Sequence, residues 1–205
     1  MNEWIEWVKQ IKAIAQIGIS YTKDDYDMDR YHQLAEISHR MMAKMADAPI
    51  EKVDHFFIPD EGYATPKVDL RAGVIKDHRI LLAKERSDEK WTLPGGWADT
   101  GESPTEGIQR EVFEETGYNV KVKRLIAIRD RNLHSYAPQY PHHVYKLFFL
   151  CDLAGGSPKE NIEISHIGFF ARDSLPPLSE GRVLKKDIDL LFKHFKNESL
   201  PVCCD

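Results

Sequence analysis

The chain has 205 residues, of which 42% are hydrophobic and 30% are charged, as expected of a globular protein with a sizeable core. Its net charge of −5 excludes a general electrostatic attraction for nucleic acid, so a phosphate-bearing ligand would need local positive charge or a metal ion. No apolar run approaches the roughly 20 residues of a membrane span, and the three cysteines lack the pattern of a disulfide framework. We therefore expect a soluble cytoplasmic protein.

Two amphipathic helices are predicted first. Apolar residues recur at three- and four-residue intervals over residues 4–15 and again over residues 31–45. Residues 22–25 resemble a capping box that would begin the second helix, and Pro49 would close it. A hairpin this small cannot bury two apolar stripes by itself. The stripes are expected to pack on the rest of the chain or on a second copy, which favours a homodimer.

The pattern changes to short β-rich runs after residue 66. The predicted strands are residues 68–75, 79–83, 120–129, 143–153 and 166–170. A three-residue turn at 76–78 makes the first two a hairpin, and amphipathic helices are expected at 104–116 and 180–196. Strands combined with these helices predict an α/β domain over residues 66–205, preceded by a helical hairpin and linker over residues 1–65.

The helix predicted at 104–116 has clear signals at both ends. Ser103 is a favourable N-cap, Pro104 suits the first helical position, and Glu106 completes a capping box. Gly117 suits the left-handed residue that ends a helix. The boundaries of this helix are therefore predicted from local sequence alone.

Three carboxylates lie close together on this helix. At about 100° per residue, Glu111, Glu114 and Glu115 fall within an arc of roughly 100°. The apolar residues expected on the core-facing side are Ile108, Val112 and Phe113. Carboxylates at this spacing repel one another, and a divalent cation would reverse that repulsion. A site whose ligands are all oxygen favours Mg²⁺ or Mn²⁺. The alternative, for such a run of glutamates taken alone, is an acidic helix face exposed to solvent.

The spacing of glycine, glutamate and arginine from Gly96 to Tyr118 resembles the Nudix box, with Tyr118 standing where the box prefers an aliphatic residue. This resemblance implies the Nudix fold, a mixed sheet sandwiched between helices, and metal-dependent hydrolysis of a diphosphate. The N-terminal hairpin also resembles a subgroup that acts on nucleoside diphosphates linked to another moiety, such as CDP-choline and ADP-ribose pyrophosphatases. The expected products are a nucleoside monophosphate and a phosphorylated moiety.

The resemblance also implies roles for individual residues. The implied ligands of Mg²⁺ or Mn²⁺ are Glu111, Glu114, Glu115 and the carbonyl of Gly96. Arg110 would belong to the catalytic site and pair with Glu102, and residues 93–96 would form a tight loop beside the helix. The candidates for the general base are Glu111, Glu160 and Glu163.

Contacts to the substrate are less specified by the sequence. Arg71, Arg131 and His134 are candidates because they could meet a phosphate, although each could equally be an ordinary exposed charge. Two alternative functions stay open, namely hydrolysis of RNA ends or nucleoside triphosphates and a non-catalytic nucleotide sensor. A basic cluster over residues 121–131 is compatible with RNA, whereas the acidic total favours a small nucleotide.

Overall fold

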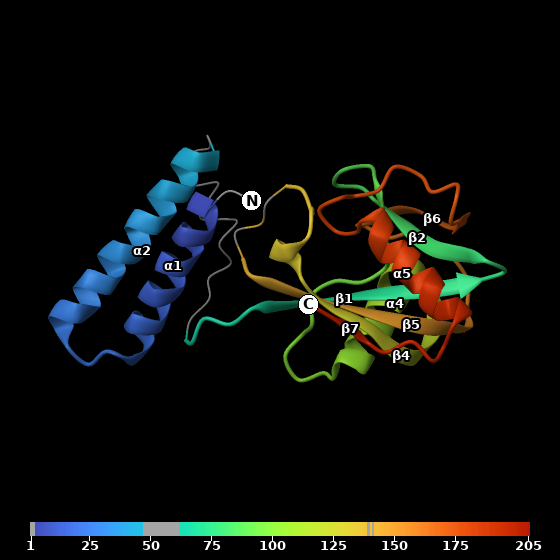
Figure 1. The fold of residues 1–205 in the computed structure, drawn as a ribbon, viewed down its shortest axis with the longest axis horizontal. Coiled ribbons are helices and arrows are strands. Elements are labelled where there is room, and N and C mark those ends of the chain that lie inside the picture. Colours follow the sequence, from blue (N-terminus) through green and yellow to red (C-terminus); the bar gives the residue numbers. More distant parts are fainter. Residues whose placement is uncertain (1–2, 47–61, 139, 141) are drawn as a thin grey trace. The chain divides into compact units, whose positions relative to one another are not determined.

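The structure is a computed structural model that describes residues 3–46, 62–138, 140 and 142–205 (Figure 1). The chain divides into two compact units. The first comprises Met1–Pro66 with Tyr140–His143, and the second comprises Lys67–Gln139 with Val144–Asp205. None of the described helices is long and apolar enough to cross a membrane.

The first unit contains the predicted pair of helices, α1 (Glu3–Tyr21) and α2 (Asp25–Ala46), which lie side by side (Figure 1). The cap of α2 differs from the prediction. Asp24 caps the helix by accepting the N–H of Asp27 at 2.9 Å, whereas Thr22 Oγ1 accepts the N–H of Asp24. The cap was misplaced by two residues because either side chain could accept a backbone N–H. Pro49 lies outside the described residues.

The hairpin has a small core of its own. Val8, Met42 and Ala43 form a cluster of buried hydrophobic residues. The stripe predicted on α1 is only partly buried, because Trp4 and Trp7 are 59% and 47% exposed. Large apolar surface therefore lies outside the core of the hairpin.

The second unit is a mixed sheet with helices, as predicted. Its strands are β1 (Lys67–Lys76), β2 (Arg79–Glu85), β3 (Trp91–Thr92), β4 (Tyr118–Asp130), β5 (Val144–Gly156), β6 (Ile164–Ala171) and β7 (Cys203–Cys204). Their order is β3-β2-β1-β5-β4-β7, with β6 paired to β2. The central pair β1·β5 and the pair β4·β7 are parallel, and the other pairs are antiparallel.

The hairpin between β1 and β2 turns at Asp77 and His78, which have φ angles of 50° and 59°. Two consecutive residues with positive φ are typical of the tight turn whose twist suits an antiparallel pair. The predicted hairpin is therefore confirmed.

Two helices cover opposite faces of the sheet. Along β2, Leu81 belongs to the apolar cluster beneath α4 (Pro104–Thr116), whereas its neighbours Ile80 and Leu82 belong to the cluster beneath α5 (Lys185–Lys196). Successive side chains of a strand point to opposite faces, so this alternation places the two helices on different sides. Figure 1 shows the same arrangement.

Two predictions about these helices were wrong. The last helix begins at Lys185 rather than at residue 180, because the N–H groups of Arg182 and Val183 both donate to the Ser179 carbonyl in a turn. In α4, Ile108 and Val112 are buried as predicted, but Phe113 is 53% exposed. Phe113 lies about 140° around the helix from Ile108, outside the buried stripe.

Candidate active site

The helix α4 has the capping expected from its sequence. The N–H of Glu106 donates to Ser103 Oγ at 3.2 Å, and the N–H of Ser103 donates to Glu106 Oε2 at 2.9 Å. Gly117 ends the helix with φ 74°. These contacts satisfy backbone groups at both ends, so α4 is a rigid support for the carboxylates that it carries.

Glu115 is the most deeply placed of these carboxylates, with 7% of the residue exposed. It accepts the backbone N–H of Gly95 at 2.8 Å. Burial raises its pKa to about 8, although the positive charge of Arg71 acts in the opposite direction. A carboxylate that burial disfavours to this extent is well suited to a cation ligand.

The loop at residues 93–96 holds Glu115 because it is bonded to β1. The N–H of Leu70 donates to the Gly96 carbonyl at 2.8 Å. Gly95 has φ +137°, and a Cβ at that position would lie 2.0 Å from the Leu70 carbonyl oxygen, so only glycine fits. A Cβ on Gly96 would approach Glu111 Oε2 to 2.9 Å. The two glycines thus let backbone pass directly beside the carboxylates of α4.

Arg110 organises the remaining acidic residues. Its Nε and Nη2 donate to both carboxylate oxygens of Glu102 at 3.0 and 2.8 Å, so the predicted pair is present. Its Nη1 donates to Glu111 and to Glu114, each at 2.9 Å. Burial raises the pKa of Glu111, whereas Arg110 lowers it. The guanidinium therefore supplies positive charge to two of the three predicted metal ligands.

A pocket of about 590 Å³ opens beside these groups. Its charged lining residues are Arg71, Glu85, Arg86, Asp99, Glu111, Glu115, Glu163 and Arg182. Within the described ranges, no three acidic, histidine or cysteine side chains already converge as a metal site. The donor chemistry nevertheless fits a hard divalent cation, because carboxylates outnumber arginines in the pocket and Glu115 is buried among them.

Arg71 lies in the pocket wall, as part of a buried ionic cluster. Its Nε and Nη2 donate to Asp69 at 2.7–3.1 Å, and its Nη1 donates to the Leu93 carbonyl at 3.2 Å. Lys146 also donates to Asp69, and burial lowers the pKa of Lys146 to about 8. This cluster ties β1 and β5 to the loop that carries the pocket glycines.

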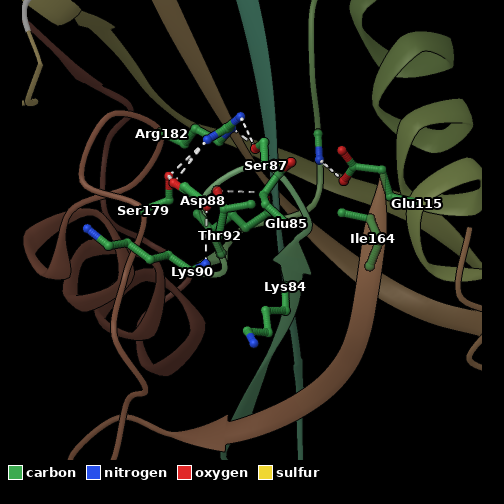
Figure 2. Close-up of polar contacts among 12 residues, drawn as sticks. Lys84, Glu85, Ser87, Asp88, Lys90, Thr92, Glu115, Ile164, Ser179 and Arg182 are labelled. Carbon is green, nitrogen blue, oxygen red and sulfur yellow. Dashed lines mark hydrogen bonds and ion pairs between the residues drawn. The ribbon is translucent and has the colours of Figure 1, made fainter. Parts of the chain in front are cut away.

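A second network forms another part of the wall (Figure 2). Arg182, from the turn before α5, lies 3.2 Å from Glu85 at the end of β2. It also contacts Asp88 at 3.3 Å and Ser179 Oγ at 3.0 Å. Arg182 therefore joins the end of β2 and the turn that follows it to a segment more than 90 residues later in the chain.

The other predicted residues are distributed unevenly. Glu163 lines the pocket, whereas Glu160 lies outside its lining and 3.5 Å from Arg86. Arg131 donates to the Pro138 carbonyl at 2.7 Å, and His134 contacts Asp205 at 2.7 Å. Neither Arg131 nor His134 is among the residues that line this pocket.

Four charged pocket residues were not predicted, namely Glu85, Arg86, Asp99 and Arg182. The predicted second strand stopped at residue 83, so the first two fell in an unassigned turn. Arg182 fell inside the helix that was predicted to begin too early. The alternation of β2 could have been followed to Glu85, but no local signal indicates that residue 182 lies against it.

The chain matches family models and known proteins in sequence. A family model described as "NUDIX domain" matches residues 69–189, and one described as "UDP-X-like, N-terminal oligomerisation domain" matches residues 2–57. A Bacillus subtilis protein provisionally named an ADP-ribose pyrophosphatase is 40% identical over 196 residues, which are 96% of this chain and 94% of that protein.

Two solved structures are also similar. A crystal structure of a UDP-X diphosphatase is 36% identical with a TM-score of 0.65, covering 99% of this chain and 98% of that one. A Streptococcus suis ADP-ribose pyrophosphatase is 36% identical with a TM-score of 0.64, covering 69% of this chain and all of that one.

Proposed function

The chain belongs to the Nudix family and is a Nudix hydrolase, and from that premise we propose that it cleaves the diphosphate of a nucleoside diphosphate linked to another moiety, of the ADP-ribose or UDP-X type. The products would be a nucleoside monophosphate and a phosphorylated moiety. CDP-choline stays a candidate within the same substrate class. We propose that residues 66–205 carry out the hydrolysis and that residues 1–65 mediate oligomerisation.

One observation carries the proposal. Glu111 and Glu115 line a single pocket together with the backbone of Gly95 and Gly96. Glycine backbone that lines a pocket beside a buried carboxylate, Glu115, supports a site at which a metal-bound diphosphate approaches the main chain closely. The relatives named for ADP-ribose and UDP-X support the same class of substrate.

The metal site would use Glu111, Glu114, Glu115 and the Gly96 carbonyl. A bound Mg²⁺ or Mn²⁺ would acidify a water molecule and neutralise charge on the diphosphate. The chain's own contribution is to position these ligands. Gly95 orients Glu115 through its N–H, and Arg110 holds Glu111 and Glu114.

The general base is proposed to be Glu163 rather than Glu160. Glu163 lines the pocket, and its N–H donates to Asn161 Oδ1 at 2.8 Å, which anchors its backbone. Glu160 lies 3.5 Å from Arg86. Glu111 stays an alternative because it also lines the pocket, and single replacement of each carboxylate by glutamine would distinguish them through the pH profile of kcat.

Hydrolysis of RNA ends is less favoured than hydrolysis of a small nucleotide. Lys123 contacts Glu198 at 2.5 Å, and Arg124 donates to the carbonyls of Glu198 and Leu200. Two cations of the basic cluster are therefore already engaged by the C-terminal segment. That engagement reduces their availability for a polyanion.

A substrate panel tests the proposal. Purified protein is incubated with EDTA, Mg²⁺ or Mn²⁺ and with ADP-ribose, UDP-glucose, CDP-choline, nucleoside triphosphates or capped RNA, and the products are separated by chromatography. We expect metal-dependent release of a nucleoside monophosphate from one or more of the first three substrates. Turnover confined to triphosphates or RNA would reject the proposed substrate class.

The hairpin α1–α2 is proposed to form a homodimer contact. The matching family model is described as an oligomerisation domain, and Trp4, Trp7 and Ile14 leave a large apolar surface on α1. Exposed apolar patches of this kind mark protein contacts. A cytoplasmic location is also proposed, because all three cysteines are free thiols.

A further inference from the structure

Three arginines line the pocket, and they differ in how far their N–H donors are already paired with other residues. Arg71 is buried, and each of its three nitrogens donates to Asp69 or to the Leu93 carbonyl. An arginine held in this way by a buried carboxylate stabilises the wall but has little capacity left for a ligand.

Arg182 is engaged as completely as Arg71. Its Nε lies 3.2 Å from Glu85, its Nη1 donates to Asp88 and Ser179, and its Nη2 donates to Ser87 at 3.3 Å (Figure 2). Removing these contacts would leave Glu85 unpaired at a position where it is almost buried. Arg182 therefore acts as a brace for the pocket wall.

Arg86 differs from both. Its backbone N–H is fixed to the Glu163 carbonyl at 2.8 Å, and its Nε donates to the Asn161 carbonyl at 3.1 Å. Its only ion pair among the described residues is with Glu160, at 3.5 Å, and the two side chains are 48% and 57% exposed. A long ion pair between exposed side chains contributes little stability, so Glu160 is readily replaced by another anion.

The position of Arg86 makes that replacement relevant to a ligand. Its backbone is anchored directly after β2, and the residue lines the pocket that contains Glu111 and Glu115. Arginine matches phosphate oxygens with two parallel N–H donors. A diphosphate held by the carboxylate side of the pocket through metal ions would leave non-bridging oxygens for such a donor.

We propose that Arg86 is a substrate-binding residue that exchanges the Glu160 carboxylate for phosphate oxygens of the diphosphate. This inference rests on the proposed function, and it assigns to Arg86 the phosphate contact that the sequence suggested for Arg71. It also gives Glu160 a role as a competitor of the substrate rather than as a base.

The test compares Arg86→Ala and Arg86→Lys with Arg172→Ala. Arg172 is a matched control, because its side chain is 46% exposed, it pairs with one acid, Asp189 at 2.6 Å, and it does not line this pocket. The readouts are kcat and KM for the best substrate of the panel, and the Kd of inorganic pyrophosphate by calorimetry with Mg²⁺ present. Circular dichroism confirms that each variant is folded, and Arg86→Gln replaces Arg86→Ala if the latter is not.

We expect Arg86→Ala to raise KM and the pyrophosphate Kd about tenfold, Arg86→Lys to raise them less, and Arg172→Ala to leave them unchanged. Values for Arg86→Ala within threefold of the wild type would overturn the proposal. If the wild type hydrolyses no diphosphate, the proposed function fails, and the pyrophosphate titration still decides the role of Arg86. A wild type that binds no pyrophosphate would overturn that role too.

Glu160→Gln provides an independent check, because the competitor and base roles predict opposite results. Loss of a competitor should lower KM and the pyrophosphate Kd by about twofold to threefold and leave kcat intact. A large fall in kcat with an unchanged Kd would identify Glu160 as a base and overturn the competitor role.

Discussion

The helices α4 and α1 have similar apolar periodicity but very different surroundings. In α4, Ile108 and Val112 are fully buried against the sheet, and its charged residues are held by partners within the same unit. In α1, Val8 and Ala15 are buried, whereas Trp4 and Trp7 are largely exposed. An amphipathic pattern therefore predicts that a helix forms, but it does not identify what covers the apolar face.

The largest expected effect concerns the buried carboxylate of α4. Glu115→Gln should lower kcat by about 10³-fold, because it removes the charge of a proposed metal ligand. It should not unfold the protein, since the amide still accepts the Gly95 N–H. The measurements are steady-state kinetics and thermal unfolding, with Glu36→Gln on exposed α2 surface as the control. Near-normal turnover of the Glu115 variant would show that Glu115 is not a metal ligand needed for catalysis.

The second prediction tests whether a partner covers α1. The wild type should have the mass of a dimer in light scattering, and Trp4→Ser combined with Trp7→Ser should halve that mass. Apolar side chains that are exposed in the hairpin would be buried in the dimer, so their loss should weaken association more than folding. Retained helicity by circular dichroism separates the two effects. A wild-type monomer would contradict the proposed contact.

A third prediction uses the pH dependence of stability without metal. The folded-state pKa of Glu115, about 8, lies above its ordinary value of 4.5, so the folded protein retains a proton that the unfolded chain has lost. The free energy of unfolding in EDTA should therefore fall as pH rises from about 4.5 to about 8, by on the order of 3 kcal/mol. Urea unfolding at pH 5 and pH 8 measures this change.

Glu115→Gln is the control for that measurement and should remove most of the pH dependence. Adding Mg²⁺ or Mn²⁺ at pH 8 should restore stability to the wild type, because a ligand that binds only the folded state stabilises it. A wild-type protein whose stability rises between pH 5 and pH 8 in EDTA would contradict the assigned burial of this charge.

The smallest effects distinguish the two sides of α4. Val112→Ala should lower the free energy of unfolding by about 2 kcal/mol, because Val112 is fully buried in the sheet-facing cluster. Phe113→Ala, at the next position but about half exposed, should change it by less than about 0.5 kcal/mol. Chemical denaturation of both variants measures the difference, and equal costs would show that a partner or another segment covers Phe113.

Local sequence predicted the elements of the second unit well, because their signals act over a few residues. The cap at Ser103 and the left-handed residue at Gly117 define α4 without reference to the rest of the chain. Predictions failed where a contact with a residue far away in the sequence decides the local structure, or where two neighbouring side chains could make the same contact. Residues 180–183 have helical periodicity, but their backbone donates to Ser179 in a turn that holds Arg182 against Glu85.

What the sequence determined by itself is the chemistry of α4: three glutamates on one arc, a glycine-rich loop before them and an arginine beside them. Tertiary structure decided which charges face the pocket and which are already neutralised. The sequence does not distinguish Arg71, Arg86 and Arg182. In the structure the buried carboxylate of Asp69 holds Arg71 and a long-range network holds Arg182, whereas the one ion pair of Arg86 among the described residues is with Glu160 at 3.5 Å. The physical reason is that a charge is available to a ligand only where folding has not already paired it, and such pairing joins residues far apart in the chain.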